Sequence, residues 1–128
     1  MTVLLDTHAL IWAVLSPAKL TPTATELIAD PTNTVLVSAA SAWELATKVR
    51  LGKLPEAEPF ETRFLDAVSG AGYTLLPIEA DVALRAGRLM ANHGDPFDRM
   101  IAAQALSLDI PVISADRQLD LFGIHRIW

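Results

Sequence analysis

Four acidic residues stand at positions in the sequence from which their carboxylates could act together. Asp6 and Asp116 lie directly beyond apolar runs, and Glu44 and Asp98 lie near the starts of predicted helices. Carboxylates that come within a few ångströms repel one another unless protons or cations compensate the charge. Mg²⁺ and Mn²⁺ prefer oxygen ligands and are often held by a few carboxylates, water and substrate phosphate. Such a site could activate a water molecule and stabilise the charge that develops during phosphodiester hydrolysis.

Polar residues near these acids in the sequence could support the same chemistry. Thr7, Ser41 and Ser114 carry hydroxyl groups that could orient water molecules or ligands through hydrogen bonds. Arg99 and Arg117 each follow one of the acids directly and could contact the backbone of a nucleic-acid substrate. We predict supporting or substrate-binding roles for these residues.

Each acid also has an ordinary structural explanation. Asp6 could be only a helix N-cap, and Asp116 a turn or cap residue. Glu44 could pair with the lysine one turn later on a solvated helix face. Asp98 could form half of a capping box with Asp95. These explanations are not independent, because a metal ion demonstrated at one acid would weaken all of them.

Strand-like runs alternate with helical patterns along the chain. The helix start at Asp95 is the best defined, since Asp95 suits the N-cap, Pro96 the first helical position and Asp98 the third. We predict strands within 2–5, 34–37, 73–76, 112–114 and 124–128. We predict helices within 9–15, 22 to near 30, 39–51, 60–68, 79–90 and 96–108, with a loop at 55–59.

This alternation implies an α/β fold. Right-handed crossovers would give a mostly parallel sheet covered by helices on both faces. Ligands of such sheets lie beyond the carboxyl ends of the strands, near the point where strand order reverses. We therefore predict one domain, residues 1–128, that gathers the acids at this edge.

Composition narrows the classes of function. The net charge of −5 opposes broad electrostatic binding to nucleic acid and favours a basic protein partner. The absence of cysteine excludes disulfides, thiol nucleophiles and cysteine-type zinc sites. Neither a signal peptide nor a membrane-spanning segment is predicted, which indicates a cytoplasmic protein without a membrane partner.

Other candidate residues carry weaker signals. His8, His93 and His125 share no metal-ligand spacing, and we assign them no direct chemical role. The three tryptophans are more typical of a core or an interface than of base stacking. No glycine-rich phosphate loop of either standard spacing occurs, which argues against an NTPase or a dinucleotide enzyme.

Four motifs stand in order along the chain: Leu5-Asp6-Thr7-His8-Ala9-Leu10-Ile11-Trp12, Ser41-Ala42-Trp43-Glu44-Leu45, Asp95-Pro96-Phe97-Asp98-Arg99 and Ser114-Ala115-Asp116-Arg117. Together they resemble the motifs of PIN domains and specifically of VapC-type toxins from toxin–antitoxin pairs. The likeness spans almost the whole chain. Four motifs in sequence are far more specific than any one of them.

The resemblance implies a three-layer α/β/α sandwich with a mostly parallel sheet of four to five strands. It implies a Mg²⁺- or Mn²⁺-dependent ribonuclease with Asp6, Glu44, Asp98 and Asp116 as its acidic set. It also implies a homodimer, an RNA substrate and a VapB-like antitoxin whose tail covers the active site. Asp95 matches the family motif too, but we assign it to helix capping.

A second hypothesis comes from a different class of protein. A non-catalytic acidic module, such as a phosphate-accepting receiver-like domain, would use Asp6 as one of a pair of acids. Against this alternative, position 7 is threonine rather than a second acid, and no lysine lies just after the fourth predicted strand. The sequence therefore favours the nuclease.

Overall fold

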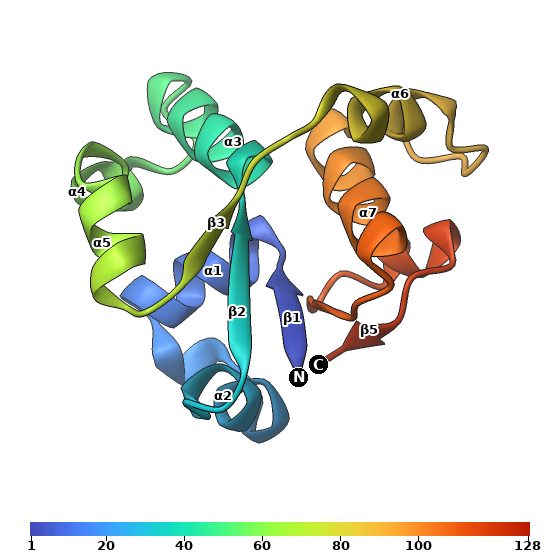
Figure 1. Ribbon diagram of the computed structural model, residues 1–128. Helices are drawn as coiled ribbons and strands as arrows, with labels where there is room; N and C mark the ends of the chain where they lie inside the picture. Colours follow the sequence, from blue (N-terminus) through green and yellow to red (C-terminus); the bar gives the residue numbers. More distant parts are fainter.

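A five-stranded parallel sheet forms the centre of the molecule (Figure 1). The computed structural model describes all residues, 1–128. The strands are β1 (Thr2–Leu5), β2 (Thr34–Ser38), β3 (Thr74–Leu76), β4 (Val112–Ile113) and β5 (Arg126–Ile127). Their order across the sheet is β3-β2-β1-β4-β5, so β1 is central and is paired on both sides.

Helices cover both faces of this sheet and make the predicted three layers (Figure 1). One face carries α1 (Thr7–Leu15), α2 (Pro22–Ala29), α3 (Ala39–Arg50), α4 (Glu58–Thr62) and α5 (Phe64–Gly70). The other carries α7 (Pro96–Leu108), with α6 (Ala80–Arg88) packed beside it and the 3₁₀ helix η3 (Arg117–Phe122). Two shorter 3₁₀ helices, η1 (Pro17–Lys19) and η2 (Pro55–Ala57), lie in connections. No helix has the length and apolar character needed to cross a bilayer.

The strand residues alternate between two hydrophobic cores, as the pleat of a sheet requires. On β1, Val3 and Leu5 belong to the core under α1–α5, whereas Leu4 belongs to the core under α7. Leu5 stands opposite Val37 of β2 and Ile113 of β4. The residue after Leu5 is therefore placed at the middle of the carboxyl edge of the sheet.

The strand order reverses beside β1. The chain adds β2 and β3 on one side of β1 and then β4 and β5 on the other. Such a reversal opens a crevice at the carboxyl ends of the strands. Receiver domains of the CheY type have the order 2-1-3-4-5 instead, so the observed order counts against our receiver-like alternative.

The predicted single helix at residues 60–68 is wrong, because the chain forms two helices there. Arg63, at φ −114° and ψ 26°, interrupts the helix between α4 and α5. Phe60 and Phe64, on either side of this break, stack in the same core with ring centroids 5.5 Å apart. The predicted loop at 55–59 is also partly helical, since α4 begins at Glu58 with Pro59 in its first turn, where proline is tolerated.

The remaining differences lie at the ends of elements. The predicted helix at 79–90 is shorter, because Leu89 leaves the helical conformation at ψ 129°. The helix η3 was not predicted, since its two buried residues, Leu119 and Phe122, give only one i, i+3 pair.

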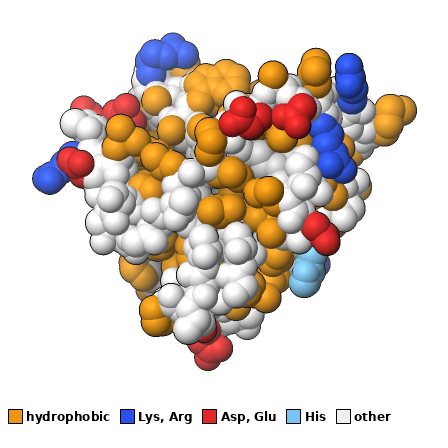
Figure 2. All heavy atoms as spheres, in the orientation of Figure 1, with side chains coloured by type: hydrophobic (Ala, Val, Ile, Leu, Met, Phe, Trp, Pro, Cys, Tyr) orange, Lys and Arg blue, Asp and Glu red, His pale blue; other side chains and the backbone are white.

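Figure 2 shows hydrophobic side chains exposed across the middle of the face that carries the edge strand β3, where Leu75 is 41% exposed.

Candidate active site

One pocket, of about 310 Å³, lies at the carboxyl edge of the sheet and is lined by all four predicted acids. Its acidic residues are Asp6, Glu44, Asp98, Asp116 and also Asp95, and its other polar or aromatic residues include Thr7, His8, Trp12 and Lys48. They come from the residue after β1, from α1 and α3, from the start of α7 with the residue before it, and from the segment after β4. The structure thus brings together the side chains that the topology of a parallel sheet predicts to meet.

Asp6 directly follows β1 and is the N-cap of α1, as the structural explanation predicts. Capping accounts for only one of its two hydrogen bonds. Its Oδ1 accepts a hydrogen bond from the backbone N–H of Ala9 at 2.7 Å, and its Oδ2 accepts one from the hydroxyl of Ser114. Asp6 is only 5% exposed. Burial raises the pKa of Asp6 to about 6, against the opposing effect of these hydrogen bonds, and the nearby charge of Asp98 raises it further.

Glu44 lies in α3 and is buried, so our alternative of a solvated helix face is wrong. Its Oε2 accepts a hydrogen bond from Nζ of Lys48, the predicted partner one turn later. Its Oε1 is buried and has no hydrogen-bond partner. A buried carboxylate oxygen without a partner is costly, and it marks a position where a cationic ligand would be stabilised.

Asp98 occupies the first turn of α7, as predicted, but the capping box does not form. Asp95 caps the helix, and its Oδ1 accepts from the N–H groups of Phe97 and Asp98 at 2.8 and 3.1 Å. The Asp98 carboxylate makes no reciprocal bond and instead contacts Nε2 of His93 through Oδ2, at 2.9 Å. Burial and the charges of Asp95 and Glu44 raise the pKa of Asp98, whereas the His93 bond lowers it.

Asp116 lies at the exposed rim of the pocket and also caps η3. Its Oδ1 accepts from the N–H of Gln118 at 2.9 Å, and its own N–H donates to the hydroxyl oxygen of Ser114 at 2.9 Å. Ser114 therefore links the carboxylate of Asp6 to the backbone of Asp116. The turn explanation and the pocket position both hold for this residue.

The three predicted hydroxyl residues are buried. The hydroxyls of Thr7 and Ser41 are hydrogen-bonded at 3.0 Å, which ties α1 to α3. Ser41 and Ser114 are fully buried, and Ser114 reaches Asp6 directly. The geometry of Ser114 suits the predicted supporting role, because it binds the carboxylate of Asp6 and the backbone of Asp116. Thr7 and Ser41 contact each other and no acid, so their supporting role stays a prediction.

The two predicted arginines do not face the pocket. The Arg99 guanidinium donates to backbone carbonyls of residues 86–93, so it stabilises a loop and is not available to meet a substrate. We predicted that Arg99 contacts the substrate because it directly follows Asp98 in the sequence. In the structure, all of its N–H groups are instead hydrogen-bonded to carbonyl oxygens. Arg117 is exposed in η3 and does not line the pocket.

The acids share one pocket but not one coordination centre. No group of three histidine, aspartate or glutamate side chains is close enough, as the side chains stand, to hold a metal ion. The lining nevertheless fits a hard divalent cation, because its acidic side chains offer several carboxylate oxygens. Burial raises the pKa values of Asp6 and Asp98, and Oε1 of Glu44 has no hydrogen-bond partner, so a bound cation would stabilise the charged form of these acids.

Sequence reasoning missed His93 and underrated Lys48. Both contact an acid of the pocket, and Lys48 also lines it. For Lys48 the signal was its spacing from Glu44. For His93 the only signal was its position in the turn just before Asp95.

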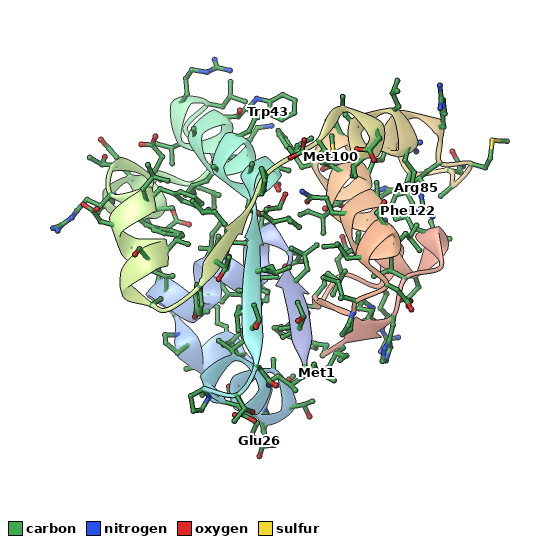
Figure 3. The ribbon with its side chains drawn as sticks, in the orientation of Figure 1. Met1, Glu26, Trp43, Arg85, Met100 and Phe122 are labelled. Atoms are coloured by element: carbon green, nitrogen blue, oxygen red, sulfur yellow. The ribbon has the colours of Figure 1, made fainter.

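An aromatic pair of one exposed and one half-buried ring lies next to two of the pocket acids. Trp43, the neighbour of Glu44 in α3, is 57% exposed and meets Phe97 edge to face, with ring centroids 4.6 Å apart. Figure 3 shows Trp43 on α3 and Met100 on α7 at the same end of the molecule. This end of the molecule therefore combines acidic and apolar surface.

Part of the chain is similar in sequence to one curated protein. Over 53 residues, 42% are identical to Ribonuclease VapC16 of Mycobacterium tuberculosis, a match that covers 41% of this chain and 38% of that protein. The chain thus matches well under half of the length of that relative.

Solved structures show the same fold. VapBC2 from Rickettsia felis, bound to a DNA fragment from its promoter, superposes with a TM-score of 0.68 at 17% identity, over 100% of this chain and 99% of that one. FitAcB from Neisseria gonorrhoeae gives 0.62 at 21% identity, over 98% and 96%. VapC20 from Mycobacterium tuberculosis gives 0.59 at 18% identity, over 95% of each chain.

A family model covers nearly the whole sequence. The PIN domain model matches residues 3–124, which include every acid of the pocket and all strands except the last. By this match, and in agreement with its fold, the chain belongs to the PIN domain family.

Proposed function

We propose that the protein is a metal-dependent endoribonuclease that serves as the toxin of a toxin–antitoxin pair. One observation carries the nuclease proposal. Three acids from separate elements, Asp6, Glu44 and Asp98, line one pocket, and each accepts a hydrogen bond from its own side-chain partner. Those partners are Ser114, Lys48 and His93.

The electrostatics of the pocket support a requirement for a cation. Lys48 is the only arginine or lysine that lines the pocket, and it is already paired with Glu44. An RNA phosphate that enters would meet several carboxylates with little compensating positive charge. Additional positive charge is therefore needed before a phosphodiester can bind there.

Mg²⁺ or Mn²⁺ would supply that charge, lower the pKa of a water molecule and stabilise the developing charge on the phosphate. Asp6, Glu44 and Asp98 are the residues that would hold it, with Asp116 at the rim. Glu44 has its unpaired Oε1 for this purpose, and Asp98 has Oδ1, to which the structure assigns no hydrogen bond.

The side chains of this protein would orient the site. Ser114 and the N–H of Ala9 fix both oxygens of Asp6, so this carboxylate has a defined direction before substrate arrives. A carboxylate with a fixed direction suits a ligand of a cation that activates a water molecule.

The relatives support the biological part of the proposal. One similar protein is named a ribonuclease, VapC20 is described as a toxin that cleaves the sarcin–ricin loop, and other neighbours are VapBC and FitAB assemblies. By analogy we propose a VapB-like antitoxin and a homodimer. The net charge of −5 favours a basic partner, and the exposed Trp43 offers it apolar surface near the pocket.

RNA cleavage by purified protein tests the nuclease. We expect cleavage with Mg²⁺ or Mn²⁺, none with EDTA, and at least a hundredfold loss in Asp6→Asn, because asparagine can still cap α1 but carries no charge. The control is Asp109→Asn, an exposed acid outside the pocket, whose φ of 53° asparagine accommodates. Equal cleavage by Asp6→Asn would indicate a contaminating nuclease and contradict the proposal.

Expression in cells tests the toxin. We expect growth arrest that requires Asp6 and that is relieved when a small basic protein from a neighbouring reading frame is co-expressed. Arrest by the Asp6→Asn protein would separate toxicity from the pocket.

A further inference from the structure

His93 belongs to the segment between α6 and α7 and contacts an acid of the pocket. Its Nε2 lies 2.9 Å from Oδ2 of Asp98, and its side chain is only 13% exposed. An ionised carboxylate only accepts hydrogen bonds, so His93 donates from Nε2–H in this pair. No other hydrogen bond reaches either nitrogen of the His93 ring.

The backbone of His93 is fixed independently of its ring. Arg99 donates from Nη1 to the carbonyl oxygens of His93, at 2.9 Å, and of Ala91, at 3.2 Å. The same guanidinium donates to the carbonyls of Ala86, Gly87 and Leu89, at the end of α6. Arg99 therefore holds the whole connection from α6 to His93.

The His93 ring is also held by packing. It lies against Phe122 of η3, with ring centroids 5.4 Å apart, and the Arg99 guanidinium lies 5.9 Å from the centre of the same phenyl ring. Phe122 is buried, and Figure 3 labels it beside α7. His93 thus has three separate partners: Arg99 binds its backbone, Phe122 packs against its ring and Asp98 contacts its Nε2.

We propose that His93 is a positioning residue that fixes the carboxylate of Asp98 for ligand binding. Its Nε2–H holds Oδ2 and leaves Oδ1 as the oxygen available to a divalent cation. Hydrogen bonds of this kind orient metal-binding carboxylates, and their loss typically lowers metal affinity or activity about 10- to 100-fold. This inference rests on the proposed function and adds to it a residue outside the acidic set.

Two substitutions separate the hydrogen bond from the packing. His93→Phe keeps an aromatic ring against Phe122 but removes the donor, whereas His93→Gln keeps an N–H donor at a similar reach. His125→Phe is the matched control, because His125 is exposed and lies away from the acidic pocket. Thermal unfolding of each variant verifies that it is folded.

Three measurements test the proposal. In the metal-free protein, long-range ¹H–¹⁵N NMR should show the His93 tautomer protonated at Nε2. In Mn²⁺ titrations by calorimetry, His93→Phe should weaken binding tenfold or more, and His93→Gln should recover most of the affinity. In RNA cleavage, His93→Phe should lower kcat much more than it changes KM.

The outcomes distinguish this inference from the proposed nuclease activity. Mn²⁺ affinity that is unchanged in His93→Phe, or equally weakened in His93→Gln, overturns the positioning role, and so does an Nδ1-protonated tautomer. A wild-type protein that binds Mn²⁺ without cleaving RNA counts against the nuclease alone, and the affinity of the variants still decides the role of His93.

Discussion

Ser114 donates its hydroxyl hydrogen to Oδ2 of Asp6, although the two residues are 108 positions apart in the sequence. The contact exists because β1 and β4 are neighbours in the sheet and both end at the same edge. The strand order reverses between these two strands. The centre of the pocket is thus built where a parallel α/β sheet places its crevice.

The first prediction concerns Asp6 and pH. Folding raises the pKa of Asp6 from 3.8 to about 6, so the folded protein binds the proton more tightly than the unfolded chain does. The stability that the protonated Asp6 contributes is fully present below about pH 4, near the pKa of the unfolded chain. It is lost as the pH rises through about 6, the pKa in the folded protein. At pH 7, Asp6→Asn should be more stable than wild type, by an amount on the order of 2–3 kcal/mol.

Urea unfolding between pH 4 and 8 measures this effect. The stability advantage of Asp6→Asn should shrink as the pH falls towards 4, and Asp109→Asn serves as the exposed acid-to-amide control. A variant that is less stable than wild type at pH 7 would show that the negative charge of Asp6 stabilises the fold.

The second prediction concerns the pair formed by Lys48 and Glu44. Lys48→Met keeps most of the length of the side chain but leaves a buried carboxylate without its one partner. Removing one member of such a pair costs about 3 kcal/mol, and Lys48 is 26% exposed, so we expect a loss at or below that value. Glu44→Gln combined with Lys48→Met should recover most of the lost stability, because the amide needs no counterion.

A double-mutant cycle by chemical denaturation checks this coupling. Additive effects of the two substitutions would mean that the pair contributes nothing to folding. In that case, Glu44 would have to be stabilised by another group.

The third prediction concerns divalent cations and stability. A cation that binds the folded pocket should stabilise the protein by about 2.7 kcal/mol when its concentration is one hundred times its dissociation constant. The melting temperature should rise accordingly. EDTA should reverse the shift. Asp98→Asn should lose most of it, because one carboxylate is gone and the mutual repulsion that the cation relieves is smaller.

Scanning calorimetry with Mn²⁺, against NaCl of equal ionic strength, provides the measurement. Asp109→Asn should respond like wild type. An equal response in Asp98→Asn would place the binding site elsewhere on the surface.

Much of the fold could be predicted from local patterns. The strands at Thr2–Leu5 and Thr34–Ser38 are short apolar runs, and α7 begins at the residue that its capping signals indicate. The break at Arg63 could not be predicted, because the spacing of Phe60 and Phe64 suits one helix as well as two. Packing in the core decides between them.

The pocket residues that directly follow strands could be predicted from the sequence. Asp6 and Asp116 follow strands, and the parallel topology alone brings such residues together. His93 could not be found in this way, because its place beside Asp98 depends on a loop whose path Arg99 fixes. The role of Arg99 was misjudged for the same reason, since a sequence shows the charge of a guanidinium but not the carbonyl groups around it.

The central position of β1 has a consequence for control of the protein. Because β1 is hydrogen-bonded to β2 on one side and β4 on the other, the end of β1 that carries Asp6 cannot move without breaking hydrogen bonds to both neighbours. An inhibitor is therefore expected to block the entrance of the pocket rather than to distort it. Once the inhibitor dissociates, the protein should regain full activity at once, with no slow conformational change.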